Sequence, residues 1–447
     1  CPNSSKIDLD SAIQSADKSF SQWSHLTQND RSEFLFKIAD LIERDLDEFA
    51  KAESIDNGKP YSLSKSLDIP RSIKNLRFFA SMANSIEAES YHKENIVSHI
   101  LKQPLGIVGA ISPWNLPLYL FTWKIAPALV SGNCVIAKPS EITPYTAYLF
   151  SKICIEANLP AGTLNILHGN GAMIGREIVR HEKIKAISFT GGTKTGKEIA
   201  REASNNLKKI NLEMGGKNPV IVFDDCNYDE MMNSLLKSSF LNQGQICLAG
   251  SRIYVQRKIY EKFKDDFISR VKKLKIGDPF DSSTDQGAIV SIEHLNKISK
   301  YVDHAIEEGG KILVGGNIPK INGGCASGWY FSPTVIENLP QSSILNQEEI
   351  FGPVVTLNQF DEENDAIQMA NDTDYGLASI IWTENVSRAH KLAEVVESGL
   401  VWINCWLERD LRTPFGGIKN SGFGKEGGKY ALDFFTEPKN ICTKYYD

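Results

Sequence analysis

The sequence lacks the features that mark several large classes of protein. No apolar run reaches the roughly 18 residues of a membrane-spanning helix, because the best candidate, 117–130, is interrupted by Lys124. No block of like charge occurs and the formal net charge is only −6, so nothing favours binding to nucleic acid or to a membrane surface. The eight cysteines are scattered, and no two have metal-ligand spacing. We therefore expect a reduced, cytoplasmic protein with neither a metal site nor a disulfide framework.

What is present predicts a large α/β protein. Hydrophobic residues make up 42% and charged residues 23% of 447 residues, which fits a folded globular chain of two or three domains. Two amphipathic helices come first, one with Leu9, Ile13, Ala16, Phe20 and Trp23 on its apolar face, the next with Leu35, Ile38, Ile42 and Phe49. Short apolar runs without polar alternation follow, and these predict buried parallel strands joined by helices. The runs are 107–111, 134–137, 164–167, 186–189 and 219–223.

Polar residues and glycines follow these predicted strands, where an open parallel sheet has its ligand crevice. Lys138 and Glu141 come just after the second strand and could hold the ribose hydroxyls of a nucleotide. An acidic side chain there disfavours a 2′-phosphate and so favours NAD over NADP. Gly191 and Gly192 follow the fourth strand, and glycines at such turns let backbone N–H groups approach a phosphate. Taken singly, the first pair also fits an ordinary ion pair, and the second pair a tight turn.

Three further residues have the chemistry of a covalent catalyst. Cys247 follows a helix and a turn at Gly244, which would expose its sulfur as a nucleophile. Glu213 lies between apolar residues and is followed by two glycines, where a partly dry cleft would make it a general base of raised pKa. Asn115 lies just past the first strand and could donate a hydrogen bond to an oxyanion. Each also fits a plain structural role: a buried cysteine, a strand-edge or helix-capping glutamate, and a turn asparagine.

Seven segments containing these residues, taken together and in order, resemble the aldehyde dehydrogenase superfamily. They are 112–117, 138–141, 189–192, 212–219, 242–247, 348–353 and 414–417. The resemblance implies a Rossmann-like parallel-sheet NAD domain, an α/β catalytic domain and a small β arm for oligomerisation. The expected boundaries are 1–82 and 105–215 for the NAD domain, 216–420 for the catalytic domain, and 83–104 with 421–447 for the arm. The open strand edge of such an arm predicts a homodimer or homotetramer.

The same resemblance implies a role for each residue. Cys247 is the nucleophile, Glu213 activates water for deacylation, and Asn115 forms the oxyanion hole with the backbone N–H of Cys247. The reaction then passes through a thiohemiacetal, hydride transfer to NAD, and hydrolysis of a thioester. The implied cofactor contacts are Lys138 and Glu141 at the adenosine ribose, Glu349 at the nicotinamide ribose, Phe351 near the nicotinamide, and Trp114, Gly191 and Gly192 along the cofactor path.

A narrower resemblance is to the branch of 2-aminomuconic and 2-hydroxymuconic semialdehyde dehydrogenases. It rests on residues 404–411, 68–71 and 78–79. In that branch Arg71 and Arg409 would clamp the far carboxylate of the substrate, with Leu116 also in the substrate site, since a planar guanidinium suits a carboxylate. The expected substrate is an acidic semialdehyde such as 2-aminomuconate semialdehyde of tryptophan (kynurenine) catabolism. Alternatively, Arg409 pairs with Glu408 or Asp410, and Arg71 lies on a solvated helix face.

Other functions compete with this one. The same chemistry could act on retinal or an aliphatic aldehyde, for which a pair of cations in the pocket would be poorly placed. A catalytically silent structural or binding homologue is a rival of another class, although Cys247, Glu213 and Asn115 are all present. A cysteine hydrolase normally needs a histidine beside its thiol, and none of the eight histidines lies in these segments.

Overall fold

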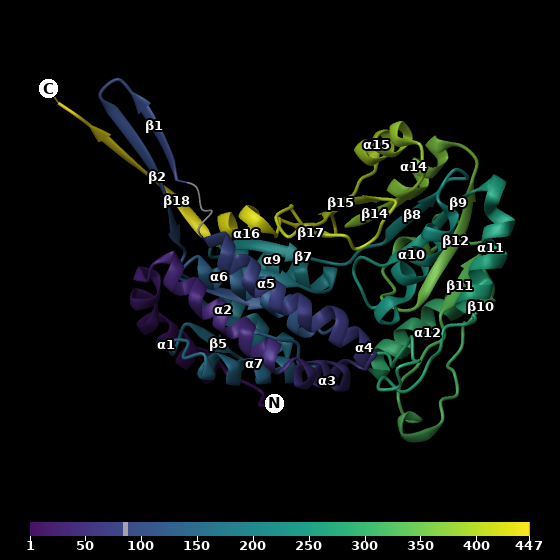
Figure 1. Ribbon diagram of the computed structural model, residues 1–447, viewed down its shortest axis with the longest axis horizontal. Coiled ribbons are helices and arrows are strands. Elements are labelled where there is room, and N and C mark those ends of the chain that lie inside the picture. The colour runs from purple at the N-terminus through teal and green to yellow at the C-terminus, as the bar shows by residue number, and fades with distance from the viewer. Residues whose placement is uncertain (84–87, 447) are drawn as a thin grey trace.

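The computed structural model describes residues 1–83 and 88–446, so residues 84–87 of the expected arm and the last residue, 447, lie outside the described part. The described residues form three larger sheets and a two-stranded one. Figure 1 shows two bodies of sheet and helix side by side, with a long arm of strands projecting from the first of them. No helix in the described residues is both long and apolar enough to cross a membrane.

The first sheet has six strands in the order β17-β7-β6-β3-β4-β5. Every neighbouring pair is parallel except β17 with β7. The two central strands β3 and β4 are buried along their whole length, which explains why their sequences lack polar alternation. The strands are β3 (Ile107–Ile111), β4 (Cys134–Lys138), β5 (Leu164–Ile166), β6 (Ile184–Thr190), β7 (Lys209–Glu213) and β17 (Gly422–Phe423).

Helices surround this sheet and share one apolar core with it. Capping boxes begin the first two helices, from Ser5 to Asp8 and from Thr27 to Asp30. The predicted placing of Phe49 on the second helix is wrong, because that helix ends at Arg44 and Phe49 lies on the next one. The helices are α1 (Lys6–His25), α2 (Gln28–Arg44), α3 (Leu46–Asn57), α4 (Tyr61–Leu63), η1 (Ser64–Asp68), α5 (Ile69–Met82), α6 (Pro117–Val130), α7 (Tyr145–Glu156), η3 (Gly171–Gly175), α8 (Arg176–Arg180), α9 (Thr193–Ser204) and α16 (Gly428–Phe434).

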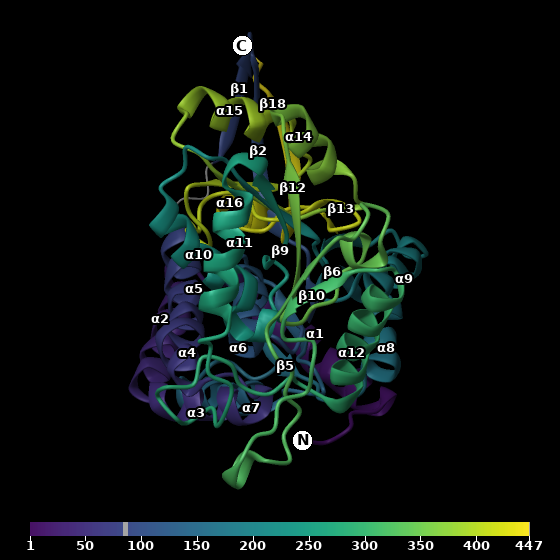
Figure 2. The same ribbon diagram turned by 90° about the vertical axis from the view of Figure 1, so that its right-hand side faces the viewer.

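The second sheet has seven strands in the order β10-β11-β12-β9-β8-β14-β15, and only β10 is antiparallel to its neighbour. Its strands are β8 (Asn218–Val222), β9 (Gly250–Gln256), β10 (Lys311–Val314), β11 (Thr334–Glu337), β12 (Val354–Phe360), β14 (Ala378–Trp382) and β15 (Leu400–Ile403). The remaining elements of this region are α10 (Tyr228–Phe240), η4 (Leu241–Gly244), α11 (Arg257–Val271), α12 (Ile292–Glu307), η5 (Gly323–Cys325), α13 (Ile344–Gln347), α14 (Glu363–Asn371), α15 (Val386–Val395), and the short pair β13 (Tyr375–Gly376) and β16 (Ile418–Lys419). Figure 2 shows α11 and α12 near the viewer on this side of the molecule.

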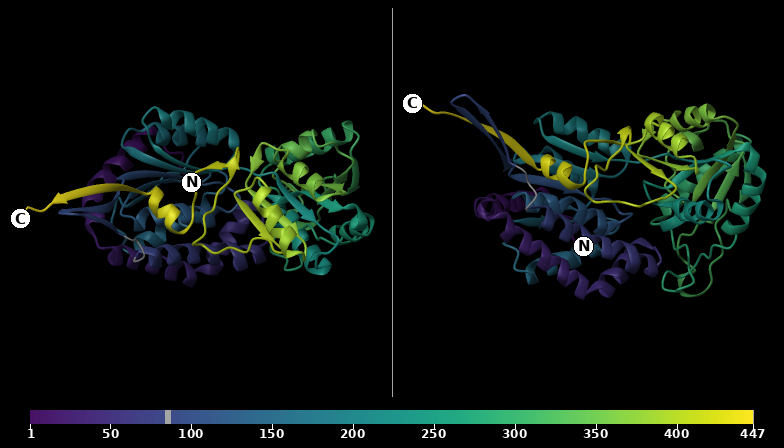
Figure 3. Two further views of the ribbon diagram at one scale, coloured as in Figure 1. Left: turned by 90° about the horizontal axis from the view of Figure 1, so that it is seen from above. Right: turned by 45° about the horizontal axis from the view of Figure 1, so that its top comes forward.

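The third sheet is an antiparallel arm of β1 (Glu89–Lys93), β2 (Ile96–Pro104) and β18 (Thr436–Lys444). Most side chains of β1 and β18 are exposed, and Figure 3 shows these strands leaving the first body on the side away from the second. Along the chain, β17 and α16 come just before β18, but they belong with the first sheet. β17 pairs with β7, and α16 packs into the apolar core around that sheet. We therefore propose the three units expected from the sequence, with 421–435 moved from the arm to the first domain.

Candidate active site

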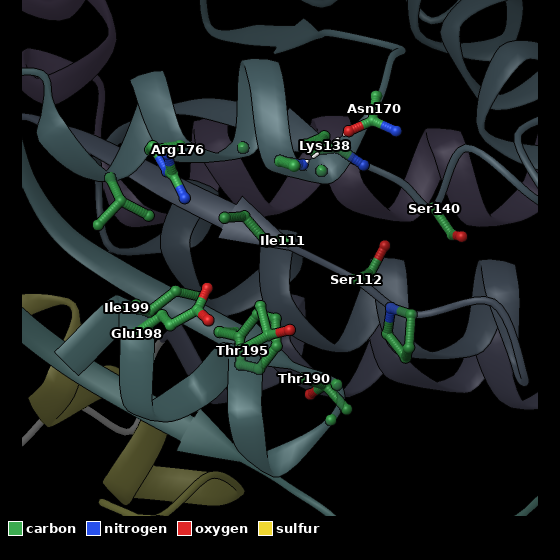
Figure 4. A pocket seen from close by; sticks show the side chains of 18 of the residues that line it. Ile111, Ser112, Lys138, Ser140, Asn170, Arg176, Thr190, Thr195, Glu198 and Ile199 are labelled. Carbon is green, nitrogen blue, oxygen red and sulfur yellow. Dashed lines mark hydrogen bonds between the residues drawn. The ribbon is translucent and has the colours of Figure 1, made fainter. Parts of the chain in front are cut away.

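A crevice of about 650 Å³ opens beyond the carboxyl ends of β3, β4 and β6. Figure 4 shows residues of its wall that sequence reasoning missed: Arg176 from α8, with Thr195, Glu198 and Ile199 from α9. The spacing of the last three on one helix face was the signal that could have found them. Five predicted cofactor residues also line the crevice: Trp114, Lys138, Glu141, Gly191 and Gly192.

The polar groups at one end of this crevice are already paired. Lys138 Nζ donates to Glu141 Oε2 at 3.0 Å, and the backbone N–H of Gly171 donates to Glu141 Oε1 at 2.9 Å. Burial alone would raise the pKa of Glu141, but these two donors outweigh it and lower the pKa. Burial also lowers the pKa of the Lys138 ammonium. The pair is thus an ionised carboxylate held in place by an ammonium and a backbone amide.

The two predicted glycines serve different purposes. A Cβ on Gly191 would lie 2.4 Å from the ring of Phe189, so close packing requires a glycine there. A Cβ on Gly192 would meet nothing within 4 Å, because this residue opens onto the crevice. Gly192 is also the N-cap of the twelve-residue helix α9, an end that favours negative charge.

Glu349 and Phe351 lie on the loop before β12. Glu349 Oε1 accepts a hydrogen bond from the backbone N–H of Gly216 at 2.9 Å, and burial raises the pKa of this carboxyl to about 7. The ring of Phe351 meets the ring of Trp114 edge to face, with centroids 5.2 Å apart. The loop before β12 therefore contacts the loop after β3.

A histidine that the sequence did not single out joins this contact. The ring of His294 lies 5.3 Å from that of Trp114, and its Nε2 is 2.7 Å from the carbonyl oxygen of Phe351. Burial lowers the pKa of His294 to about 4, so the ring is neutral and donates to that oxygen. Phe351 has a positive φ of 61°, a strained conformation for a bulky residue that this hydrogen bond helps to hold. These residues lie far apart in the sequence, so no local motif pointed to the contact.

Cys247 follows a strained turn. Asn242 and Gln243 in η4 have positive φ values of 53° and 57°, and Gly244 has 68°. A Cβ on Gly244 would lie 2.2 Å from the carbonyl oxygen of Gly352, so only glycine fits. The expected sharp glycine turn before the cysteine is therefore present, and the side chain of Cys247 is partly exposed.

The surroundings of Cys247 favour its protonated thiol. Burial, with the smaller effects of Glu349 and Glu213 in the same direction and of Arg409 in the opposite one, raises the pKa of Cys247 to about 12. These electrostatic contributions mean that the predicted base and the predicted substrate arginine both lie in the neighbourhood of the sulfur. The thiol must lose its proton before it can attack a carbonyl carbon.

Glu213 ends β7 with only 3% of its surface exposed, and neither carboxylate oxygen has a hydrogen-bond partner. Burial raises its pKa well above the ordinary value, and the nearby carboxylate of Glu426 raises it further. Lys124 and Lys425 act in the opposite direction, although Lys124 Nζ itself donates to Glu426 at 2.8 Å. The arrangement is that of a buried carboxyl that holds its proton more tightly than an exposed one and can act as a proton acceptor when ionised.

The side-chain amide of Asn115 lies beside the cysteine segment. Its Nδ2 donates to the carbonyl oxygen of Gln245, two residues before Cys247, at 3.0 Å. An amide has two N–H groups, so the second remains for another acceptor. Leu116 is buried next to it, in an apolar group with Tyr119 and Leu120.

Arg71 and Arg409 lie near each other, and neither forms an ion pair with an acidic side chain in the described part of the chain. The guanidinium of Arg409 lies 3.9 Å from the ring centroid of Phe415, and that of Arg71 lies 5.1 Å from the ring of Tyr119. Burial lowers the pKa of Arg71, and the positive charge of Arg409 lowers it further. Nη2 of Arg71 and both Nε and Nη2 of Arg409 are buried without a hydrogen-bond acceptor.

Neither arginine has the ordinary surroundings that the sequence also allowed, which were an ion pair with a neighbouring acidic residue for Arg409 and a solvated helix face for Arg71. Asp410 binds Arg412, with Nη2 and Oδ2 2.5 Å apart, and forms no ion pair with Arg409. Arg71 is half-buried rather than solvated, and its Nε donates to Asn75 Oδ1 at 3.2 Å. Across residues 1–83 and 88–446, no group of three or more His, Cys, Asp or Glu side chains could hold a metal ion.

Comparison with known proteins defines the class to which this fold and site belong. A match to the aldehyde dehydrogenase family spans residues 1–441, and the chain belongs to that family. The predicted enzyme class and α/β fold are thereby confirmed.

Individual relatives show which members of the family the chain is similar to. The chain is 45% identical over 448 residues to the human 2-aminomuconic semialdehyde dehydrogenase, covering 99% of this chain and 92% of the relative. It is 41% identical over 446 residues to the 2-hydroxymuconic semialdehyde dehydrogenase of Pseudomonas sp. (strain CF600), covering 98% and 92%. Among solved structures, a betaine aldehyde dehydrogenase from Staphylococcus aureus in complex with NAD+ superposes with a TM-score of 0.96 at 40% identity, covering 99% of this chain and 88% of that one.

Proposed function

We propose that this protein oxidises an acidic semialdehyde to a dicarboxylate, with NAD as the oxidant and Cys247 as the nucleophile. Bound NAD would supply the hydride acceptor. The crevice residues fit that cofactor, since Glu141 is held at one end and Gly192 opens onto the space. Thr190 on the crevice wall (Figure 4) has a buried hydroxyl oxygen without a partner, as a polar ligand would require. The NAD complex of the staphylococcal relative supports the same choice.

The covalent chemistry rests on three side chains. The sulfur of Cys247, once deprotonated, attacks the aldehyde carbon, and the oxyanion that forms accepts hydrogen bonds from Asn115 Nδ2 and the backbone N–H of Cys247. After the hydride leaves, a thioester remains on the sulfur. Glu213 then takes a proton from water, whose oxygen attacks the thioester carbon, and the carbon–sulfur bond breaks to release the carboxylic acid and the thiolate of Cys247. The raised pKa of the buried Glu213 carboxyl makes it a stronger proton acceptor, when ionised, than an exposed glutamate.

The substrate assignment is carried by one observation, the two guanidinium groups with buried, unpaired N–H groups. Buried donors without acceptors are unfavourable, and a carboxylate is the acceptor that a planar guanidinium binds most strongly. A semialdehyde has a carboxylate at the end opposite its reactive carbon, so Arg71 and Arg409 would bind it while the aldehyde faces Cys247. The relatives that act on muconic semialdehydes support 2-aminomuconate semialdehyde, of tryptophan and kynurenine catabolism, as the candidate. A neutral aldehyde would leave both cations unpaired.

We also propose a homodimer or homotetramer in the cytoplasm. The outer edges of β1 and β18 are unpaired within the described chain, and an exposed strand edge favours pairing with another copy. All eight cysteines are free, which suits a reducing compartment.

The test is NADH production with 2-hydroxymuconate semialdehyde and with a neutral aldehyde of the same chain length. We expect Arg409→Met and Arg71→Met each to lower kcat/KM for the acidic substrate by about 10- to 100-fold, as expected when a carboxylate loses a buried cation. The neutral aldehyde should change little, and the exposed Arg412→Met should affect neither substrate. Cys247→Ser serves as the inactive control.

Two other outcomes would contradict parts of the proposal. Equal losses for both substrates in the Arg71 and Arg409 variants would remove the carboxylate clamp and favour a neutral aldehyde such as retinal. NAD binding without NADH formation from any aldehyde would favour a catalytically silent homologue.

A further inference from the structure

A fully buried ionic cluster lies beneath the loop that carries Asn115. Lys59 Nζ is 2.5 Å from Asp68 Oδ2 and 3.6 Å from Glu53 Oε1, and all three side chains have 0% exposure. Burying three ionisable groups is costly unless their geometry and hydrogen bonds compensate. None of the three contributes to the chemistry described above, so the cluster needs another explanation.

The cluster and the neighbouring Asn57 together contact the loop 114–118 at three points. Lys59 Nζ donates to the carbonyl oxygen of Asn115 at 2.9 Å. Asn57, two residues earlier, donates through Nδ2 to the carbonyl oxygen of Trp114 at 2.8 Å. Glu53 Oε2 accepts from the backbone N–H of Leu118, in the first turn of α6, at 3.4 Å. The end of α3 and the residue after its Gly58 cap therefore hold both sides of Asn115.

The turn that carries Lys59 is also rigid. Gly58 ends α3 with φ of 86°, and a Cβ there would lie 2.9 Å from the carbonyl oxygen of Ala288, so the turn is fixed by packing. Burial raises the pKa of Glu53 to about 7 and also raises the pKa of Asp68. Lys59 therefore lies between two buried carboxyls and binds one of them, Asp68, directly. A hydrogen bond from an ammonium is shorter and stronger than one from a neutral donor.

The other side of Asn115 is held by the cysteine segment. Asn242 Nδ2 donates to the same carbonyl oxygen of Asn115 at 3.1 Å, so two donors occupy its two lone pairs. The Asn115 side chain is tied to the carbonyl oxygen of Gln245. Backbone and amide are thus both fixed, and the remaining N–H of the amide has a single direction.

We propose that Lys59, held by Asp68 and Glu53, is a positioning residue for the oxyanion hole, which it supports by fixing the backbone of Asn115. The inference rests on the proposed function, because it assigns Asn115 as an oxyanion donor. Lys59 does not touch the substrate. Its contribution is geometric, since a displacement of about 1 Å in a reacting group can lower a rate by about 100-fold.

Two variants remove the hydrogen bond from Lys59 to the carbonyl oxygen of Asn115. Lys59→Met deletes the ammonium but leaves two buried carboxyls, so its stability is expected to fall. The triple variant Glu53→Gln, Lys59→Met, Asp68→Asn removes the charges together and keeps the side-chain volumes similar. We expect kcat to fall by about 10- to 100-fold in the triple variant, with NAD affinity and KM little changed.

A matched control separates an effect on the position of Asn115 from a general loss of stability. Lys208 is another buried lysine whose Nζ donates to backbone carbonyls, those of His181 and Ile184, outside the site. Lys208→Met should lower the melting temperature and leave kcat unchanged. A triple variant that keeps the parental kcat would overturn the proposal.

A double-mutant cycle with Asn115→Ala decides whether Lys59 acts through Asn115. Asn115→Ala alone should lower kcat by about 10²–10³-fold. In that background the triple substitution should cost about threefold or less, because the positioned group is already gone. A full loss in both backgrounds would show that Lys59 acts elsewhere and would overturn the inference alone. Parental kcat in Asn115→Ala would instead overturn the oxyanion assignment of the proposed function, and the inference with it.

Discussion

The charged groups at the two ends of the active site differ in whether they are paired. At the cofactor end, the carboxylate of Glu141 is bound by Lys138 and by the backbone of Gly171, at 3.0 and 2.9 Å. At the reactive end, both oxygens of Glu213 and several nitrogens of Arg71 and Arg409 are buried without partners. Buried polar groups in folded proteins are normally satisfied, so exceptions mark places where an outside partner is expected.

The difference separates binding from reaction. The paired end is already in its working arrangement and can bind a cofactor with little change. The unpaired end holds a carboxyl and two cations whose best partners are water, an aldehyde and a substrate carboxylate. Such an arrangement reduces stability locally, and it persists because the surrounding fold holds it. If this comparison is right, substitutions at the two ends should affect different quantities.

The largest expected effect is that of Glu213→Gln on turnover. Loss of the base should lower steady-state kcat by about 10²–10³-fold, within the range for general base catalysis. Because we propose that Glu213 acts after hydride transfer, one equivalent of NADH per site should still form rapidly. Stopped-flow measurement of NADH absorbance gives both numbers.

The amount of NADH formed in the first turnover distinguishes between the steps at which Glu213 could act. Cys247→Ala should show no first-turnover NADH, which sets the baseline. A loss of the first-turnover NADH in Glu213→Gln, equal to its loss of kcat, would place the base at the thiol step instead of the deacylation step.

A smaller effect is expected in the pH dependence of stability. Burial raises the folded-state pKa of Glu213, so the stabilisation is complete below the ordinary value near 4.5 and is lost as pH rises through the folded value. Glu213→Gln cannot ionise there. Its free energy of unfolding relative to the parent should therefore rise as the pH increases above the ordinary carboxyl value and level off once the folded carboxyl ionises, at no more than about 1.4 kcal/mol per pH unit.

The pair of Lys138 and Glu141 at the cofactor end provides the comparison for this measurement. Lys138→Met should lower the free energy of unfolding by about 1 kcal/mol at each pH above the ordinary carboxyl value, because it leaves Glu141 without its cation. Denaturant unfolding of both variants at several pH values tests the comparison. A Glu213→Gln variant whose relative stability falls as pH rises would show that the carboxyl is ionised and satisfied in the folded protein.

The smallest expected effect is that of Glu141→Gln on cofactor choice. Removing the charge should weaken NAD binding by about fivefold, the value of one ordinary hydrogen bond. NADP binding should not weaken, because the repulsion between the carboxylate and a 2′-phosphate is gone. Titration with both nucleotides measures the ratio, and an equal weakening for both would remove Glu141 from ribose recognition.

The sequence predicted the parts of this protein that depend on local pattern. Buried strands such as 107–111 and 134–137 were recognisable because a strand covered on both faces has no polar alternation. The segment after β4 was recognisable because residues at strand ends face the crevice of an open sheet. The boundary near Asp45 was missed, since the apolar period continues from α2 into α3 across a short break.

Contacts between distant segments were beyond such reasoning. His294 lies against Trp114 and Phe351, but nothing near any of the three indicates the others. Lys59 stands in an ordinary-looking turn, and only the fold places its ammonium under Asn115. The sequence named Arg409 with two acidic neighbours, and only the structure showed that Asp410 binds Arg412 instead.

The sequence by itself predicted the family, several of the parallel strands with their intervening helices, and the residue types that stand at the ends of those strands, because these follow from periodicity and from motifs within short segments. Tertiary structure alone decided which charges are paired and which are left open. That outcome depends on distances between side chains from different elements and on the exclusion of water, and folding sets both only when the two sheets and their loops come together.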